Sequence, residues 1–286
     1  MGVYGSPVAQ SEAGGSGAFV INWVSTIVLD VGAQAHEGKV MKYSVLRSAI
    51  YVFSVLCFVM ATARADTING TSGDDSLTGT SSGDVINAGE GNDTVDAEGG
   101  DDSISGDGGN DSINAGTGND AVRGNGGDDT INGESGNDTL YGGAGSDSMS
   151  GGADADTLNG YGGDDTLNGG TGGDVVYGGD GGDLISGGEG GDNLDGEDGK
   201  DTIRGGAGSD TIEGGAGADK LYDNDGLTSD ADADTIDAAD GSGGDTIVAG
   251  KGDLILADSN DQVKIVDEAG VVEFDGTFDE YQVWNS

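Results

Sequence analysis

Residues 142–150 read Gly-Gly-Ala-Gly-Ser-Asp-Ser-Met-Ser. A glycine-rich run leads to Asp147, and an apolar side chain, Met149, follows two residues later. The same nine-residue pattern returns eighteen times between residues 66 and 222 without an insertion. A fixed period of this length indicates a repeat architecture in which each unit packs on its neighbours.

The aspartate and the apolar residue keep their register along the whole array. The registered aspartates are Asp66, Asp75, Asp84, Asp93, Asp102, Asp111, Asp120, Asp129, Asp138, Asp147, Asp156, Asp165, Asp174, Asp183, Asp192, Asp201, Asp210 and Asp219. The apolar residues two positions later run from Ile68 to Leu221. Side chains alternate along a strand, so the apolar residue should point inward and its two neighbours outward. We expect each unit to form a six-residue turn and a three-residue strand.

Glycine is expected to serve the turns, because it takes φ > 0 easily and lets backbones approach closely. The first turn position is Gly in fourteen of the seventeen full units and Ala in three, and the fourth position is Gly in fifteen. The residue before each aspartate is often Asn, Asp or Gly, the types that tolerate a left-handed conformation. We expect that conformation there too.

The composition restricts the possible functions. The 286 residues include Gly 61 and Pro 1, and the formal net charge is -44. One small apolar side chain per unit supports a thin stacked core rather than a globular one. This charge repels nucleic acid and anionic lipid surfaces, so neither is expected as a partner. Cations are the expected ligands, since self-repulsion destabilises a compact acidic chain.

The units resemble the GGxGxDxUx nonapeptides of RTX (repeats-in-toxin, haemolysin-type calcium-binding) proteins. The resemblance covers residues 66–222 and implies an all-β fold, a parallel β-roll (β-solenoid) with two units per coil. It also implies several Ca²⁺ ions in the turns, held by backbone carbonyls and by registered aspartates eighteen residues apart, such as Asp93 with Asp111 or Asp120 with Asp138. The implied metal ligands are Asp75, Asp84, Asp93, Asp102, Asp111, Asp120, Asp129, Asp138, Asp147, Asp156, Asp165, Asp174, Asp183, Asp192, Asp201, Asp210 and Asp219. Nine coils would be roughly 40 Å long at a strand spacing near 4.8 Å.

Residue chemistry agrees with calcium as the ligand. Ca²⁺ takes about six to eight oxygen ligands, from carboxylates and carbonyls in flexible geometry. The alternative is that the aspartates only cap turns, as single aspartates commonly do. Stacked rows of like charge would be left uncompensated in that case, so calcium is preferred. On this hypothesis the chain is expanded without calcium and folds on binding it, with a Kd of about 10⁻⁴–10⁻³ M.

Residues 41–65 are expected to be a secretory signal peptide. Lys42 and Arg47 form a basic segment, an apolar run follows, and small residues up to Ala65 provide a cleavage site. A transmembrane anchor is the alternative. The uncharged run 48–63 is 16 residues long, which is short for a span of roughly 20.

Residues 1–40 are expected to be an extension upstream of the true start codon, at Met41. Cleavage of the signal peptide after Ala65 would leave a mature chain that begins at Asp66 and is secreted from a bacterial cell. The only cysteine, Cys57, and the only histidine, His36, lie before that residue. Disulfides, zinc sites with Cys or His ligands, cysteine nucleophiles and histidine acid–base chemistry are therefore not expected in the mature chain.

Residues 223–286 are expected to contain degenerate repeats and a C-terminal β cap. The Asp-x-aliphatic triplet returns with irregular spacing at Asp234, Asp245, Asp253 and Asp261. The last segment is richer in apolar and aromatic residues, as a cap over the last core layer requires. In RTX proteins the C-terminus is commonly a type I secretion signal, which competes here with the Sec-like signal as the export route.

The even-numbered units place small polar groups on one outer face. The pairs are Ser76/Thr78, Thr94/Asp96, Ser112/Asn114, Thr130/Asn132, Ser148/Ser150 and Thr166/Asn168. A solvated sheet face is the simplest interpretation. The alternative is a surface that binds a regular ligand, either ice or a cell-surface or extracellular polysaccharide.

The preferred hypothesis is a secreted calcium-binding repeat protein with a structural, adhesive or matrix role. An accessory module of a secreted carbohydrate-active enzyme is the alternative. Catalysis by the chain itself is not expected, because residues 1–65 contain no catalytic domain and the mature chain lacks histidine. A pore-forming toxin is disfavoured, since no long apolar segment follows the signal and membrane insertion is not expected.

Overall fold

The computed structural model describes residues 64–223, 234–238, 244–249, 253–257, 261–266 and 272–276. All of them fall within one compact unit, Val59–Ser286. Every element in these ranges is a β-strand, and they contain no helix with the length and apolar character of a membrane span. The predicted upstream extension and all but the last two residues of the predicted signal peptide lie outside the described residues.

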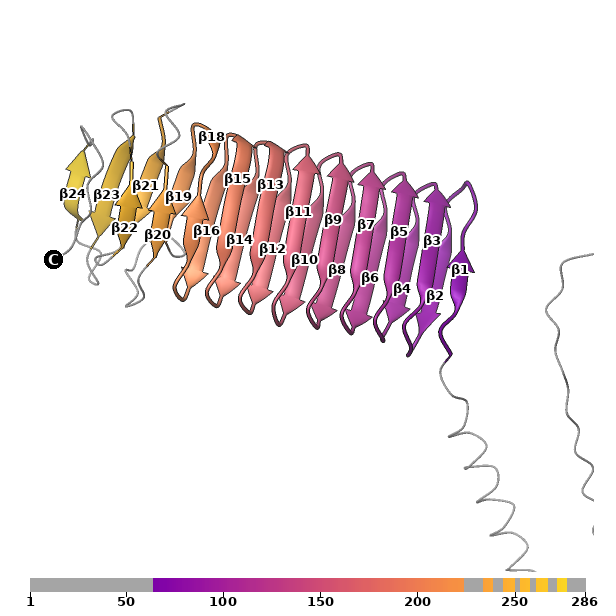
Figure 1. Ribbon diagram of the computed structural model, residues 1–286. Helices are drawn as coiled ribbons and strands as arrows, with labels where there is room; N and C mark the ends of the chain where they lie inside the picture. Colours follow the sequence, from indigo (N-terminus) through magenta and orange to yellow (C-terminus); the bar gives the residue numbers. More distant parts are fainter. Residues whose placement is uncertain are drawn as a thin grey trace, which may run out of the picture. The chain divides into compact units, whose positions relative to one another are not determined.

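Two sheets carry the fold, and strands alternate between them along the chain up to β17 (Figure 1). Sheet A contains β1 (Thr67–Asn69), β3 (Val85–Glu90), β5 (Ser103–Gly108), β7 (Ala121–Gly126), β9 (Thr139–Ala144), β11 (Thr157–Gly162), β13 (Val175–Gly181), β15 (Asn193–Gly199), β17 (Thr211–Glu213), β18 (Ala216–Gly217), β20 (Thr235–Asp237) and β22 (Leu254–Leu256). Sheet B contains β2 (Ser76–Thr80), β4 (Thr94–Glu98), β6 (Ser112–Thr117), β8 (Thr130–Ser135), β10 (Ser148–Ala153), β12 (Thr166–Thr171), β14 (Leu184–Glu189), β16 (Thr202–Ala207), β19 (Lys220–Tyr222), β21 (Thr246–Ala249), β23 (Gln262–Val266) and β24 (Val272–Gly276). The all-β parallel solenoid that the resemblance to RTX repeats implied is confirmed.

Two units make one coil, as predicted. Within each sheet, residues eighteen positions apart lie side by side, for example Ile68 beside Ile86 in sheet A and Met149 beside Leu167 in sheet B. Because the repeat has no insertions, every aliphatic residue falls on the same side of its sheet in each coil.

Strands at the irregularly spaced triplets continue both sheets. β17 pairs with β20 and β19 with β21, although the steps in sequence are now 24 and 26 residues. The connecting segments absorb the additional residues while the strands keep their register. β24 then pairs with β23 in the antiparallel sense, so it ends the parallel stack. The aromatic end of the predicted cap, after residue 276, lies outside the described residues.

The strands are longer than the three residues expected. β3 pairs with β5 not only at Ile86 and Ile104 but also at Gly89 with Asp107 and at Glu90 with Gly108. The prediction was wrong because half of the glycine-rich segment also pairs with the next coil. This pairing provides hydrogen-bond partners for backbone groups that a free turn would leave unsatisfied.

Left-handed backbone occurs at two turn positions, the fifth and seventh residues after the aspartate. Gly89 and Gly91 have φ of 106° and 124°. At the fifth position the chain also uses larger residues, such as Asp107 with φ of 71°. The residue before the aspartate is not left-handed: Asn92 is absent from the positive-φ set, so that expectation was wrong.

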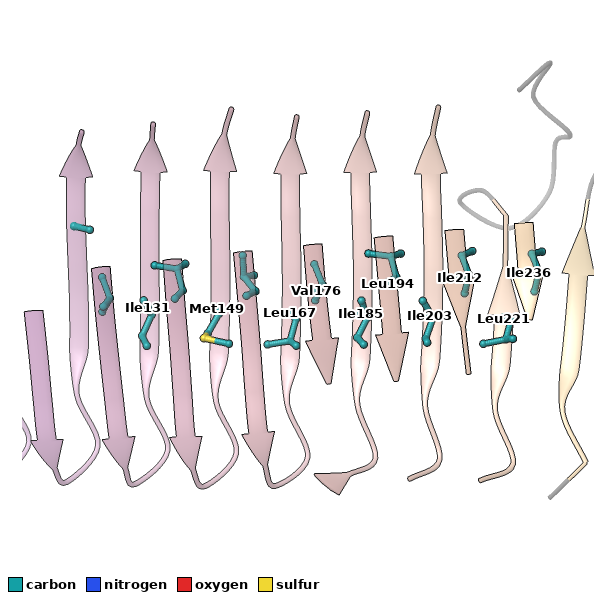
Figure 2. Close-up of a cluster of buried hydrophobic side chains, with 14 of the residues drawn as sticks. Ile131, Met149, Leu167, Val176, Ile185, Leu194, Ile203, Ile212, Leu221 and Ile236 are labelled. Carbon is teal, nitrogen blue, oxygen red and sulfur yellow. The ribbon is translucent and has the colours of Figure 1, made fainter. Parts of the chain in front are cut away.

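The core is a row of single aliphatic side chains between the two sheets (Figure 2). From Ile86 to Leu221 each of them is at most 2% exposed, whereas Ile68 and Leu77 in the first two units are partly buried. Full burial of one such side chain contributes about 1.5–3 kcal/mol. That is small against the conformational entropy lost when nine residues are ordered, so the turns must also contribute to stability.

Candidate metal-binding turns

The registered aspartates lie at the turn-to-strand junctions and are buried. From Asp84 to Asp219 their exposure is 1–3%. Oδ1 of each accepts a hydrogen bond from the backbone N–H of the registered aspartate one coil earlier. Asp93 N–H donates to Asp111 Oδ1 at 2.8 Å, and Asp120 N–H donates to Asp138 Oδ1 at 2.8 Å. The structure thus brings the predicted pairs together, with the backbone of one aspartate meeting the carboxylate of the next.

The second oxygen of these carboxylates, Oδ2, is buried and receives no hydrogen bond in the central units. The residues concerned are Asp93, Asp102, Asp111, Asp120, Asp129, Asp138, Asp147, Asp156, Asp165, Asp174, Asp183, Asp192 and Asp201. A buried acceptor without a partner costs roughly 1–3 kcal/mol, and more when it is charged. A row of such atoms therefore indicates that these oxygens bind a ligand, because no hydrogen-bond donor of the protein satisfies them.

Glycine at the first turn position makes room for this oxygen. A Cβ on Gly124 would overlap Asp129 Oδ2 and would lie 2.7 Å from the carbonyl oxygen of Gly142, one coil later. A carboxylate and a carbonyl oxygen therefore converge beside Gly124. The same arrangement recurs at Gly160, between Asp165 Oδ2 and the Gly178 carbonyl. These glycines are needed for close approach, and their φ lies outside the left-handed region.

Burial makes the ionised form of these aspartates unfavourable. It raises the pKa from 3.8 to about 7 at Asp129, Asp156, Asp165 and Asp201, and to about 6 at Asp102, Asp120 and Asp138. The hydrogen bond to Oδ1 lowers the pKa, but it does not offset burial. Neighbouring carboxylates contribute to the rise in pKa, as Asp147 and Asp111 do for Asp129. A cation at Oδ2 would reverse this preference.

The available donors fit a hard divalent cation such as Ca²⁺. The turns offer carboxylate and carbonyl oxygens, the ligands that Ca²⁺ prefers, and the described residues contain neither Cys nor His. Three carboxylates come within 4.8 Å of one another at one place in the described ranges, and it lies beyond the regular array. An ion in a regular turn would therefore depend on backbone carbonyls as well as aspartates.

Comparison with known families agrees with this geometry. The model of the RTX calcium-binding nonapeptide repeat matches residues 60–95, 78–113, 87–122, 123–158, 141–176, 159–194 and 195–226. These matches join into one stretch that covers more than half of the chain. The chain belongs to the RTX calcium-binding repeat family. A search of curated proteins found no match.

The RTX units of Asp75 and Asp84, the second and third of the array, differ from the central units. Asp84 Oδ2 accepts hydrogen bonds from the Thr80 N–H at 2.7 Å and the Thr80 hydroxyl at 3.0 Å. Thr71 makes the same two bonds to Asp75 Oδ2, at 2.6 and 2.8 Å. Burial raises the pKa of Asp84, but the bonds from Asp66 and Thr80 outweigh it and the pKa is lowered. At these two aspartates the turn-capping alternative describes the contacts that the structure shows.

The degenerate RTX units keep the aspartate row, which the predicted ligand set did not include. Asp210 N–H donates to Asp234 Oδ1 at 2.9 Å and Asp219 N–H to Asp245 Oδ1 at 2.8 Å. Asp253 and Asp261 extend the two rows and are buried. Their Asp-x-aliphatic triplets were the signal that could have placed them in the set.

A second ladder of side chains joins the coils of the RTX array and was missed. Between residues 74 and 164, where the residue before a registered aspartate is Asn, Asp or Ser, its side chain accepts a hydrogen bond from the backbone N–H of its counterpart one coil later. Asn110 N–H donates to Asn92 Oδ1 at 2.8 Å, and Asp128 N–H donates to Asn110 Oδ1 at 3.0 Å. The registered aspartates accept from the coil before, so the two ladders run in opposite directions. This contact explains why Asn and Asp are frequent at that position.

The polar pairs of the even-numbered units lie together on sheet B, as predicted. Ser112, Thr130 and Ser148 are in register on β6, β8 and β10, and all three are exposed. Neighbouring amides also meet, since Asn132 Nδ2 donates to Asn114 Oδ1 at 3.2 Å.

Proposed function

We propose that this RTX protein is a secreted scaffold whose roll assembles when calcium occupies its turns. The supporting observation is the row of buried Oδ2 atoms from Asp93 to Asp201 that receive no hydrogen bond. Their desolvation and mutual repulsion oppose folding of the ionised chain. A divalent cation removes both penalties, so its binding energy becomes folding energy.

The overall charge supports the same coupling. After residue 65 the chain contains 51 acidic and 6 basic residues. At low calcium this charge keeps the chain expanded. At the millimolar calcium found outside cells, sites with a Kd of about 10⁻⁴–10⁻³ M would be filled. The roll would then stack after export through the signal at residues 41–65.

The role that we propose is structural, adhesive or matrix-forming rather than catalytic. A thin solenoid with one aliphatic residue per unit presents long outer faces and little interior. The described residues contain no His or Cys that could act as a nucleophile or proton carrier. Nucleic acid and membrane insertion are not part of the proposal, because the acidic surface disfavours contact with phosphate groups.

Small-angle scattering on the full chain tests the proposal. An unfolded chain of 286 residues has a radius of gyration of about 60 Å. We expect a value of that order in chelator and a marked fall in 5 mM calcium, with no comparable change in 5 mM magnesium. A compact particle in chelator would refute calcium-coupled assembly.

Secretion is checked separately by N-terminal sequencing of the exported protein, which should begin at Asp66.

A further inference from the structure

The outer face of sheet A carries an arginine and two tyrosines in a row whose other positions from β1 to β17 hold Asn, Ser, Asp or Glu. The third residues after the aspartate on β7, β9, β11 and β13 are Arg123, Tyr141, Asn159 and Tyr177. They lie in register on four adjacent strands (Figure 1). The two tyrosines are two strand spacings apart, which is about 10 Å. The Arg123 guanidinium lies 5.2 Å from the Tyr141 ring centre and supports that ring.

Tyr161 adds a third ring to this row at a conformational cost. Its φ is 71° and its side chain is 53% exposed. Its partners in register are Gly143 and Gly179, which take positive φ without strain. A bulky residue in this region is an outlier, and such strain is concentrated at functional sites. The Tyr161 ring lies 5.9 Å from that of Tyr141, so the exposed Tyr161 pairs with the half-buried Tyr141.

Asn159, between Tyr141 and Tyr177, has an unused acceptor. Its Oδ1 is covered and makes no hydrogen bond. Asparagines at the same repeat position elsewhere bond to each other, as Asn87 Nδ2 does to Asn69 Oδ1 at 2.9 Å. Tyrosine neighbours prevent that ladder at Asn159. The row therefore leaves one polar atom unpaired, and because that atom is covered it is not itself a contact for a ligand.

We propose that this face, the tyrosine face formed by Arg123, Tyr141, Asn159, Tyr161 and Tyr177, binds a neutral oligosaccharide. Aromatic faces pack against the C–H surface of sugar rings, and amide and guanidinium groups bond to sugar hydroxyls. Rings on alternate strands can contact separate sugar units of one extended chain.

The charge of the surroundings selects among ligands and partners. The tyrosine face contains no carboxylate, but Asp195 and Glu197 follow on β15, and the chain as a whole carries a net charge of -44. Acidic glycans and a second copy of the chain are repelled by this field. A neutral glycan is not. Glycan binding at this face requires the folded roll, so it rests on the calcium-dependent folding of the proposed function. The choice of a neutral glycan as the ligand does not depend on that function.

The test is isothermal titration calorimetry of the full chain in 5 mM calcium. The ligands are cellohexaose, laminarihexaose and mannohexaose, with polygalacturonate as the acidic comparison. We expect saturable binding of at least one neutral hexasaccharide. Tyr141→Ala and Tyr177→Ala should each weaken it about tenfold, as loss of a central aromatic contact does. Tyr222→Ala is the matched control, because Tyr222 lies on sheet B beside Arg204 at 5.3 Å and should leave binding unchanged.

Tyr161→Gly separates binding from packing. Glycine relieves the left-handed strain, so the calcium concentration at the folding midpoint should stay within about twofold while glycan binding weakens about tenfold. Loss of folding without a specific loss of binding would overturn the proposal. So would absence of neutral-glycan binding by a chain that circular dichroism shows to be folded, or binding of polygalacturonate alone. Self-association that Tyr161→Gly abolishes would assign the face to a second copy instead.

Discussion

Two adjacent glycines, Gly162 and Gly163, should respond in opposite ways to the same substitution. Gly163 has φ of 131°, and a Cβ there would overlap the carbonyl oxygen of Gly145 in the preceding coil. Gly162 has nothing within 4 Å of its Cβ position and its φ lies outside the left-handed region. Both residues are in the same turn of the roll. The stability effects of the two substitutions can therefore be compared without differences in position along the array or in the neighbouring metal site.

The magnitude for Gly163→Ala follows from two penalties. An alanine held in a sparsely populated backbone region costs roughly 1–3 kcal/mol, and overpacking against fixed backbone costs roughly another 1–3 kcal/mol. The expected loss of unfolding free energy is therefore about 2–6 kcal/mol. Gly162→Ala should instead gain about 0.4–1 kcal/mol, because alanine reduces the entropy of the unfolded chain at a compatible site.

The assay is urea unfolding in saturating calcium, followed by far-UV circular dichroism. With slopes of about 1–3 kcal/mol per molar urea, Gly163→Ala should lower the midpoint by about 0.7 M or more. Because each coil contacts only its neighbours, the transition should also broaden as the array separates into two parts. Equal effects at the two positions, or an unchanged midpoint for Gly163→Ala, would refute the assignment of close backbone approach to the seventh position.

Four further outcomes follow from individual contacts. Thr80→Val removes the hydroxyl bonded to Asp84 Oδ2 and should lower the unfolding free energy by about 1–3 kcal/mol. The control Ser81→Ala, at an exposed residue, should change it by less than about 0.5 kcal/mol, and equal urea midpoints for the two variants would contradict the Thr80 contact. Asp165→Asn should raise the calcium midpoint yet stabilise whatever roll forms in chelator, because it removes a buried charge whose Oδ2 has no donor; a calcium titration with unchanged midpoint would exclude Asp165 as a ligand. Leu158→Ala, at 0% exposure, should cost about 2–5 kcal/mol in urea unfolding, and a smaller loss would mean that the core row is not closely packed. In chelator, far-UV circular dichroism should show β-structure increasing as pH falls from about 7 to about 4, because burial raises the pKa of Asp165 to about 7 from 3.8 and the folded state then binds more protons than the unfolded one. In calcium the stability of the roll should instead fall with pH as protons compete for the ligands, and the same trend in both buffers would contradict the metal assignment.

The nine-residue period was sufficient to predict the core row and the register of the aspartates, and the resemblance to RTX repeats implied two units per coil, whereas the burial of the aspartates was not predicted. Ile86, for example, could be placed inside because its distance from the aspartate never changes, and the alternation of side chains then determines the two faces. The continuation of the roll through Asp234 and Asp245 followed from the same triplet, despite the longer steps in sequence.

Contacts between coils were harder to predict, because they depend on how far each turn is displaced along the roll relative to the turn of the next coil. The sequence indicated that Asn92 favours a turn, but its partner, the N–H of Asn110, is known only once the coils are stacked. The pairing of Gly89 with Asp107 was missed for the same reason. Thr80 and Tyr161 each replace the glycine common at the fifth position, and that departure from the repeat was the available signal for both.

Calcium titration of the full chain in chelated buffer, followed by far-UV circular dichroism, tests the central claim most directly. We predict a cooperative change from coil to β-structure at about 10⁻⁴–10⁻³ M calcium, and no such change with magnesium over the same range. A spectrum that is already rich in β-structure in chelator, or that responds equally to magnesium, would contradict calcium-coupled folding of the aspartate rows.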